Sequence, residues 1–450
     1  MAKRTSRYVC QQCGTSYPKW VGKCDNCGAW NSLVEEAAAV EKKAVVDRSR
    51  GAQLKAEKLG EVKVESLSTR LATGLGQLDE VLGGGLMPGG VVLLAGQPGI
   101  GKSTLLLQLV LAIGAAKRTL YVSGEESAGQ VKLRAERLGK GAAELVELAA
   151  TTSADDIAAT IASGEYELVI VDSMQTVAMA EVASAPGTVS QITNSANIII
   201  RAAKATNTAV VLVGHVTKEG SIAGPKVLEH LVDVVLQFEG DRYGGFKLLR
   251  AVKNRYGATS EVAILEMDGE GLKEVENASA SLLAERGKSD GSVVLATMEG
   301  NRPLLVEIQA LVNPTHFGYP KRTASGFDLN RLTLLIAVLE KRTKLDLSDK
   351  DVFINVVGGL KLVDPAADLA VCMAIASASA ERRLPDDVVV FGEVGLGGEI
   401  RRVTSVTPRI AEAKKLGFTR ALGPDMTDKN SFITPVTDLR DGLNTYLTKK

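Results

Sequence analysis

The sequence contains few of the features that mark membrane proteins or disulfide-stabilised proteins. No apolar run approaches the ~18 residues of a membrane span, and no apolar core of a secretory signal follows the basic residues 1–7. Of only five cysteines, four fall within the first 27 residues, which indicates a metal site better than a disulfide framework. A formal net charge of zero argues against general polyanion binding but allows a local basic surface. We therefore expect a soluble, cytoplasmic protein.

The most specific motif is a glycine-rich loop between a predicted strand and a predicted helix. An apolar run over residues 91–95 precedes the loop, and helical composition begins at Leu105. Glycines in such a loop let successive backbone N–H groups face a polyphosphate at the positive end of a helix. The loop matches GxxxxGK[ST] in full, and its predicted nucleotide-binding residues are Gly96, Gln97, Pro98, Gly99, Ile100, Gly101, Lys102, Ser103 and Thr104. We expect Lys102 to reach the β- and γ-phosphates of ATP and Ser103 to hold Mg²⁺.

Polar residues follow three further predicted strands, at the edge where parallel sheets bind ligands. Glu125, after the strand over residues 118–123, is our first choice to orient or deprotonate the attacking water, and Glu126 is the second. Alternatively, this pair is solvated and caps the next helix. Asp172 ends a buried strand, where a carboxylate without a partner would be costly to bury. We therefore expect it to be the carboxylate on the Mg²⁺ side of the nucleotide. His215 ends the next strand and either senses the γ-phosphate or is structural.

Four cysteines near the start form two CxxC pairs, Cys10 with Cys13 and Cys24 with Cys27, separated by ten residues. Tetrahedral Zn²⁺ takes four thiolates, and the metal would supply the folding free energy that so short a module lacks. Both tryptophans of the chain, Trp20 and Trp30, lie in or beside this module. Aromatic and basic residues together suit nucleic acid, but a zinc ribbon also packs its own aromatics, so both interpretations stay open.

The middle of the chain alternates between loops and regular elements. Residues 35–65 lack aromatics and proline and predict a mobile, partly helical linker. Residues 179–192 and 220–225 predict mobile loops, with a helix over residues 196–205 between them. Apolar and polar residues alternate over residues 232–252, with a turn at residues 241–245. This pattern predicts two paired strands, the second of which ends at Lys253 and Arg255. These two cations are either a solvated tip or, in a ring ATPase, reach a neighbouring subunit's γ-phosphate.

These motifs, in this order, resemble the bacterial RadA (Sms) family of DNA-repair proteins, within the RecA and DnaB helicase superfamily. The resemblance covers nearly the whole chain and includes the sequence KNRYG at residues 253–257, where Tyr256 replaces the family's usual Phe. It implies a homo-hexameric, ATP-driven motor that moves on single-stranded DNA and extends branched recombination intermediates, with the recombinase RecA as a partner. It also implies that Glu125, Asp172 and His215 have the roles given above, and that Lys253 and Arg255 act in trans.

The region from residue 284 to the end is similar to the Lon protease domain. Lon-type proteases pair a nucleophilic Ser with a Lys base, but Ala366 and Thr407 stand at these two positions. We therefore expect an inactive domain that helps to build the ring, with Cys372 in its core. Six basic residues either line a DNA channel or form a solvated surface: Lys321, Arg322, Arg331, Lys341, Arg342 and Lys344.

The predicted architecture is α/β, with 450 residues in several domains. These are a four-cysteine zinc module (1–34), a linker (35–65), a RecA-like ATPase (66–275) and a Lon-like α+β domain (284–450). Two rival functions are an ATP-dependent protease, which Ala366 and Thr407 oppose, and a regulatory ATPase of the KaiC type. Stimulation of ATP hydrolysis by DNA would separate the motor from the regulator.

Overall fold

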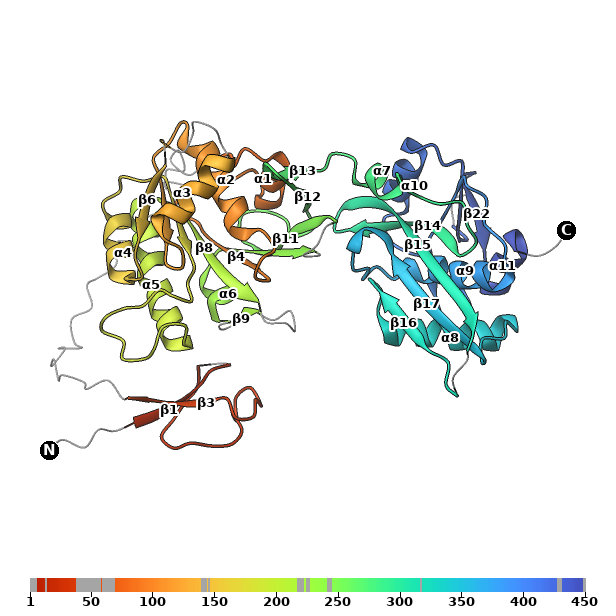
Figure 1. Ribbon diagram of the computed structural model, residues 1–450, viewed down its shortest axis with the longest axis horizontal. Helices are drawn as coiled ribbons and strands as arrows, with labels where there is room; N and C mark the ends of the chain where they lie inside the picture. Colours follow the sequence, from red (N-terminus) through yellow and green to blue (C-terminus); the bar gives the residue numbers. More distant parts are fainter. Residues whose placement is uncertain are drawn as a thin grey trace. The chain divides into compact units, whose positions relative to one another are not determined.

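The computed structural model describes residues 6–12, 14–37, 58, 69–138, 144, 146–216, 222–223, 227–240, 245–315, 318–426 and 431–447. The chain divides into two compact units (Figure 1). One unit comprises Met1–Arg242 and Lys247–Glu274, and the other comprises Tyr243–Phe246 and Val275–Lys450. The finer domain boundaries given above stay predictions.

The cysteine-rich module is a small antiparallel sheet with strand order β2-β1-β3. Its strands are β1 (Ser6–Cys10), β2 (Ser16–Tyr17) and β3 (Leu33–Ala37). Cys10, Cys24 and Leu33 form its buried centre, with Tyr8 and Tyr17 packed against them. Strand β3 pairs with β1 as far as Ala37, three residues into the predicted linker. Residues 38–57 and 59–65 of that linker lie outside the described residues.

A ten-stranded sheet forms the centre of the first unit, in the order β13-β12-β11-β10-β4-β8-β7-β5-β6, with β9 paired to β8. Strands β10, β4, β8, β7, β5 and β6 run parallel, and β11 to β13 continue the sheet in antiparallel fashion. The strands are β4 (Val91–Gly96), β5 (Thr119–Ser123), β6 (Glu147–Ala150), β7 (Leu168–Asp172), β8 (Ala209–Val216), β9 (Ile222–Ala223), β10 (Val234–Gly240), β11 (Lys247–Asn254), β12 (Val262–Asp268) and β13 (Gly271–Glu274). This arrangement confirms the predicted α/β core.

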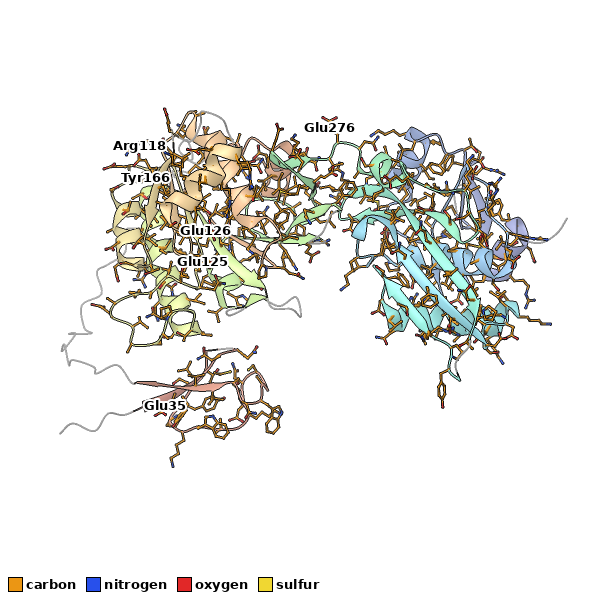
Figure 2. All side chains as sticks on the ribbon, in the orientation of Figure 1. Glu35, Arg118, Glu125, Glu126, Tyr166 and Glu276 are labelled. Carbon is orange, nitrogen blue, oxygen red and sulfur yellow. The ribbon has the colours of Figure 1, made fainter. Side chains whose placement is uncertain are left out.

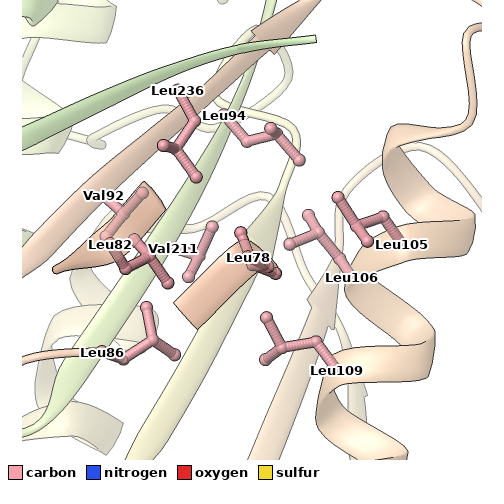
Figure 3. Close-up of a pocket in the computed structure, with 10 residues that line it drawn as sticks. All are labelled: Leu78, Leu82, Leu86, Val92, Leu94, Leu105, Leu106, Leu109, Val211 and Leu236. Atoms are coloured by element: carbon pink, nitrogen blue, oxygen red, sulfur yellow. The ribbon is translucent and has the colours of Figure 1, made fainter. Parts of the chain in front are cut away.

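Helices cover both faces of this sheet (Figure 1). They are α1 (Gly76–Leu82), α2 (Lys102–Gly114), α3 (Ala128–Leu138), α4 (Ala154–Ala162), α5 (Val189–Thr206) and α6 (Val227–Leu231). Because successive strand residues point to opposite faces, Val92 and Leu94 of β4 pack with α1 and α2, whereas Val91 and Leu93 belong to the core on the opposite face. Figure 3 shows the first of these cores, where leucines of α1 and α2 meet β4. The continuous apolar run over residues 91–95 reflects this two-sided burial.

Helix α5 begins earlier than the sequence indicated, because Val189 to Ile192, predicted as loop, are helical. Thr188 caps the first turn by accepting a hydrogen bond from the Gln191 N–H (3.4 Å). Apolar positions at helical spacing, including Val189 and Ile192, pack into the core. The Gln191 side-chain amide donates to the carbonyls of Met179 (3.2 Å), Val182 (2.8 Å) and Ser184 (2.9 Å), so it ties the preceding segment to the helix.

The second unit contains a seven-stranded mixed sheet with the order β16-β17-β15-β14-β18-β21-β22. Its strands are β14 (Ser292–Glu299), β15 (Arg302–Pro314), β16 (Arg322–Ser325), β17 (Lys350–Val356), β18 (Val388–Val390), β21 (Arg420–Pro424) and β22 (Ile433–Val436), and β19 (Glu393–Val394) pairs separately with β20 (Ile400–Arg401). Its helices are α7 (Ala278–Leu283), α8 (Leu329–Thr343), α9 (Ala367–Ala380), α10 (Val406–Lys415) and α11 (Leu439–Tyr446). The alanine-rich α9 is buried over residues 367–377, and Cys372 lies in the core as predicted.

Candidate functional site

The glycine-rich loop joins β4 directly to α2, and Lys102 is the first residue of that helix. Gly99 (φ 78°) and Gly101 (φ 116°) have backbone conformations that side chains disfavour, which explains glycine at both positions. The Lys102 Nζ donates to the carbonyls of Gly96 (2.8 Å) and Gln97 (3.1 Å), within its own loop. Burial lowers the pKa of Lys102, and the negative charges of two carboxylates partly offset this effect. These carboxylates belong to Asp172 and Glu125.

Glu125 and Glu126 follow β5 at the same edge of the sheet, and Figure 2 labels both. The Glu125 carboxylate accepts a hydrogen bond from the Ser173 hydroxyl, at the end of β7. The Glu126 carboxylate instead forms an ion pair with Arg134 of α3 (2.7 Å). The contacts therefore separate the two candidates, because Glu125 is near Lys102 and Glu126 is engaged with a helix.

Asp172 lies at the carboxyl end of β7, in register with Ser123 of β5. Its Oδ2 accepts a hydrogen bond of 2.6 Å from the Tyr121 hydroxyl, which sequence reasoning did not identify. Burial, together with the charge of Asp172, raises the pKa of Tyr121 well above its ordinary value. Tyr121 thus stays a neutral donor that orients the carboxylate.

His215 of strand β8 is in register with Gly96 of the adjacent parallel strand β4, so the His215 backbone lies beside the start of the phosphate loop. Its side chain lies outside the described part of the structure, and its proposed contact with the γ-phosphate stays a prediction. Ser103 and Thr104 are half-buried in the first turn of α2, next to Lys102. Buried Lys102, the adjacent hydroxyls and the carboxylate of Asp172 fit a nucleotide with its Mg²⁺.

Lys253 and Arg255 lie at the opposite edge of the same sheet. Strand β10 runs parallel to β4, and its first residue, Val234, pairs with Asn254 at the end of β11. The two cations are therefore near the amino end of β4, whereas the phosphate loop follows its carboxyl end. At ~3.3 Å per residue, β4 alone separates them from the loop by roughly 17 Å. They do not converge with Lys102 within one subunit.

The Lys253 ammonium contacts backbone carbonyls at the end of α6. Its Nζ donates to Glu229 (2.7 Å), His230 (3.3 Å) and Val232 (2.7 Å). A cation is favourable there because the last carbonyls of a helix carry partial negative charge. Burial and the nearby charge of Arg255 lower the pKa of Lys253.

Asp233 connects Arg255 to the strand that carries the phosphate loop. Its carboxylate accepts from Arg255 Nη1 (2.9 Å), from Lys204 Nζ (3.1 Å) and from the Val91 N–H (3.1 Å), at the first residue of β4. Burial alone would raise the pKa of Asp233, but the hydrogen bonds from Val91 and Lys204 outweigh it and lower that pKa. Sequence reasoning missed Asp233. The signal that could have identified it is its position as the one acid within the apolar run of residues 231–236.

The cysteine module brings three thiols together. The sulfur atoms of Cys10, Cys24 and Cys27 all lie within 4.8 Å of one another, and those of Cys10 and Cys27 are 3.6 Å apart. Tetrahedral zinc with ~2.3 Å bonds places its sulfur ligands about 3.8 Å apart, so the donor set fits this metal. Two matching turns present the thiols, with Gly14 N–H bonded to Cys10 O and Gly28 N–H to Cys24 O, both at 2.8 Å. Cys13 lies outside the described residues.

In the second unit, the two positions predicted for a Lon-type nucleophile and its base differ from each other in burial. Ala366 is fully buried at the start of α9, whereas Thr407 is exposed on α10. Between β14 and α10, a buried Arg409 forms an ion pair with Asp364 (2.7 Å) and donates to the Ala296 carbonyl (2.6 Å). The geometry at these two positions offers no pair of groups for acyl transfer.

The six basic residues proposed for a channel differ in their contacts. The Arg331 guanidinium binds the buried Asp368 through two nitrogens, and Arg322 donates to the carbonyls of Lys350 and Leu347. Both therefore serve packing within the domain. Lys341 and Lys344 are exposed at the end of α8.

Comparisons with known proteins identify all three regions. Residues 59–221 match the model of an AAA domain, residues 8–35 match a rubredoxin metal binding domain, and residues 333–427 match subunit ChlI of Mg-chelatase. The chain therefore combines a RecA/AAA-type ATPase core with an N-terminal metal-binding ribbon and a C-terminal ChlI/Lon-like domain. Within the described helices, none has the length and apolar character that a membrane crossing requires.

Several relatives align along nearly the whole chain. The DNA repair protein RadA of Halalkalibacterium halodurans is 48% identical over 431 residues, which cover 94% of this chain and 93% of the relative. Those of Pseudomonas aeruginosa and Bacillus subtilis are each 48% identical over 429 residues, covering 94% of this chain and 94% and 93% of the relatives. A crystal structure of the RadB recombinase aligns with 46% of this chain and 100% of its own at 23% identity and a TM-score of 0.37, too distant to support an inference.

Proposed function

The chain belongs to the RadA family of DNA repair proteins, and from that premise we propose that it is a DNA-dependent ATPase working as a hexameric ring. The ring moves along single-stranded DNA and processes and extends branched recombination intermediates, in concert with a RecA-type recombinase. Its cofactors are Mg²⁺ at the nucleotide and Zn²⁺ in the N-terminal module. Its place of action is the cytoplasm.

In this proposal each residue at the carboxyl edge of the sheet has a separate task. The N–H groups of the loop and Lys102 hold the phosphates of ATP, while Glu125 orients the attacking water and accepts its proton. Ser103 and Asp172 are the residues that would hold Mg²⁺, which supplies charge neutralisation at the phosphates when bound. Tyr121 keeps the Asp172 carboxylate in place through the 2.6 Å hydrogen bond.

The observation that carries the ring proposal is the position of Lys253 and Arg255. They lie at the amino edge of the sheet, across β4 from the subunit's own loop. Charge that develops on the γ-phosphate is stabilised by cations within contact distance. In this proposal the two residues therefore serve the site of a neighbouring subunit, not that of their own. To do so, Lys253 exchanges the carbonyls at the end of α6 for phosphate oxygens.

We propose that the C-terminal domain is proteolytically inactive and acts in ring assembly and DNA contact. Its buried Ala366 and exposed Thr407 support this, and so does the ion pair between Asp364 and the buried Arg409. Digestion of casein with ATP present tests it directly. The domain is expected to leave casein intact, and cleavage would favour the protease.

The test of the proposed function is ATP turnover with and without single-stranded DNA at two salt concentrations. We expect stimulation that weakens at the higher salt, because phosphate contacts release counterions. The Lys102→Ala variant should lose hydrolysis and keep its fold. If DNA leaves ATP turnover unchanged, the motor proposal is wrong and a KaiC-type regulatory ATPase becomes the better account.

A further inference from the structure

The metal-binding ribbon carries two largely exposed tryptophans that lie outside its buried centre. Trp20 is 54% exposed and Trp30 is 72% exposed. The aromatic side chains packed around the cysteines are instead those of Tyr8 and Tyr17. Large aromatic side chains contribute to stability mainly through burial, so packing within the ribbon does not account for the two tryptophans.

Gly22 lies close to both indole rings. A Cβ atom on this glycine would lie 3.7 Å from Cη2 of Trp20 and 3.9 Å from Cζ3 of Trp30. The six-membered ring edges of both indoles therefore approach the same residue. The backbone beside them is held in place, because the Asn31 N–H donates to the Gly22 carbonyl (2.8 Å) and Lys23 forms a bridge with Trp30. The result is a pair of largely exposed indole rings held close to one another.

Positive charge accompanies these rings. The Lys23 ammonium lies 5.6 Å from the centroid of the Trp30 ring, a favourable cation–π distance. Lys19 is exposed and precedes Trp20 in the chain. A ligand that suits this surface has a flat π-face for the indoles and a negative charge for the lysines. An unpaired nucleotide has both, whereas bases in a duplex are already stacked on each other.

We propose that Trp20, Gly22 and Trp30, with Lys19 and Lys23, form a stacking site for an unpaired base of single-stranded DNA. This inference rests on the proposed function, because DNA is the proposed partner, and it adds a DNA contact outside the ATPase core. Stacking is sequence-tolerant, since every base has a π-face. The ribbon thereby holds the strand independently of the nucleotide state of the ring.

Intrinsic fluorescence tests this site without a label, because the chain contains only these two tryptophans. The full-length, metal-loaded protein is titrated with oligothymidylate, and with a duplex of equal length. We expect saturable quenching by the single strand and weaker quenching by the duplex. In binding assays with a labelled single strand, Trp20→Leu and Trp30→Leu should each weaken affinity about tenfold.

The sharpest variant is Gly22→Leu, which keeps both tryptophans and all cysteines. Gly22 is not among the glycines with positive φ and its Cβ position has only ordinary contacts, so the backbone accepts leucine, whose side chain covers the ring edges of both tryptophans. We expect quenching to be lost at an unchanged metal content. Gly287→Leu is the matched control, because nothing lies within 4 Å of its Cβ position; quenching should persist there.

Four outcomes overturn the stacking site. Undiminished quenching in Gly22→Leu is one, and absence of quenching while DNA still stimulates ATP turnover is another, which leaves the proposed function standing. Quenching by a RecA-type recombinase and by no oligonucleotide would assign the tryptophans to a protein partner. Absence of both quenching and stimulation would remove the proposed function as well.

Discussion

At the scale of single residues, the contacts of Glu125 and Glu126 distinguish two adjacent carboxylates of the same chemistry. Glu125 shares a hydrogen bond with Ser173 and is one of the charges felt by Lys102. Glu126 is paired with Arg134 and its N–H is bonded to the Ser123 hydroxyl (3.0 Å). Glu125 therefore faces the nucleotide site, while Glu126 fixes the start of α3.

We predict that Glu125→Gln lowers ATP turnover by roughly 10² to 10⁴-fold, because the amide cannot accept the proton of the attacking water. Affinity for a fluorescent ATP analogue should change little, since the loop and Lys102 remain. Glu126→Gln is the matched control, and its turnover should stay within a few-fold of wild type. Equal loss in both variants would show that this assignment of the base is wrong.

The sequence was sufficient to predict the residues at the carboxyl edge, because all parallel strands of a sheet end at the same edge. Lys102, Glu125 and Asp172 could be grouped in this way without knowledge of the strand order. Tyr121 and Asp233 could not, because their partners are 51 and 142 residues away in the chain. Such contacts depend on which strands become neighbours, and local pattern does not encode that order.

At the scale of elements, the ribbon depends on its metal, because three short strands bury too little surface to fold alone. We predict that Cys27→Ala lowers bound zinc from about one ion per chain to a small fraction. The zinc content of the full-length protein is measured with a colorimetric chelator after the metal is released. Cys372→Ala is the control, since this thiol is fully buried in the second unit. Zinc loss in the control, or retention in Cys27→Ala, would contradict the site.

The ion pair between Asp364 and the buried Arg409 links β14 to α10 and predicts a dependence on pH. Burial alone would raise the pKa of Asp364, but the hydrogen bond and charge of Arg409 outweigh it and lower that pKa. A lowered pKa means that the stabilisation is complete above the ordinary carboxyl pKa of ~4 and is lost as pH falls through the folded value. Hydrogen-exchange protection of β14 and α10 should therefore decline below about pH 4.

Asp364→Asn should reduce the stability of this region by about 3 kcal/mol at neutral pH, because it leaves the Arg409 charge buried without its partner. The same exchange measurement should then show a weaker decline in acid. Replacement of both residues, Asp364→Leu with Arg409→Met, is the control and should recover much of the protection. Unchanged protection in Asp364→Asn would mean that the pair does not stabilise this junction.

Element boundaries were predicted less well than element types. The start of α5 was placed too late because residues 179–192 taken together are small, polar and glycine-containing, whereas the Thr188 cap and the buried Val189 and Ile192 make the last four of them helical. Likewise, β3 extends to Ala37 because β1 offers it a pairing partner from Ser6 to Cys10. In both cases a tertiary contact overrides local propensity.

At the scale of the whole molecule, the proposed ring explains why one subunit carries its phosphate loop and its two cations at opposite edges of one sheet. The loop with Lys102 is at the carboxyl edge, and Lys253 with Arg255 is at the amino edge. In the proposed ring, a complete site takes two subunits, one providing the phosphate loop and the next providing the cations. Asp233 would then connect neighbouring sites, because it contacts both Arg255 and the first residue of β4.

The most direct test is to mix two inactive variants, Lys102→Ala and Lys253→Ala, before the ring assembles, and to measure ATP turnover with single-stranded DNA. If sites are shared between subunits, about a quarter of the sites in an equal mixture combine an intact loop from one variant with intact cations from the other. Turnover should then recover to about a quarter of the wild-type value. Each variant alone, assembled to the same size by light scattering, should stay inactive. A mixture as inactive as its components would contradict the shared site, and with it the proposed ring mechanism.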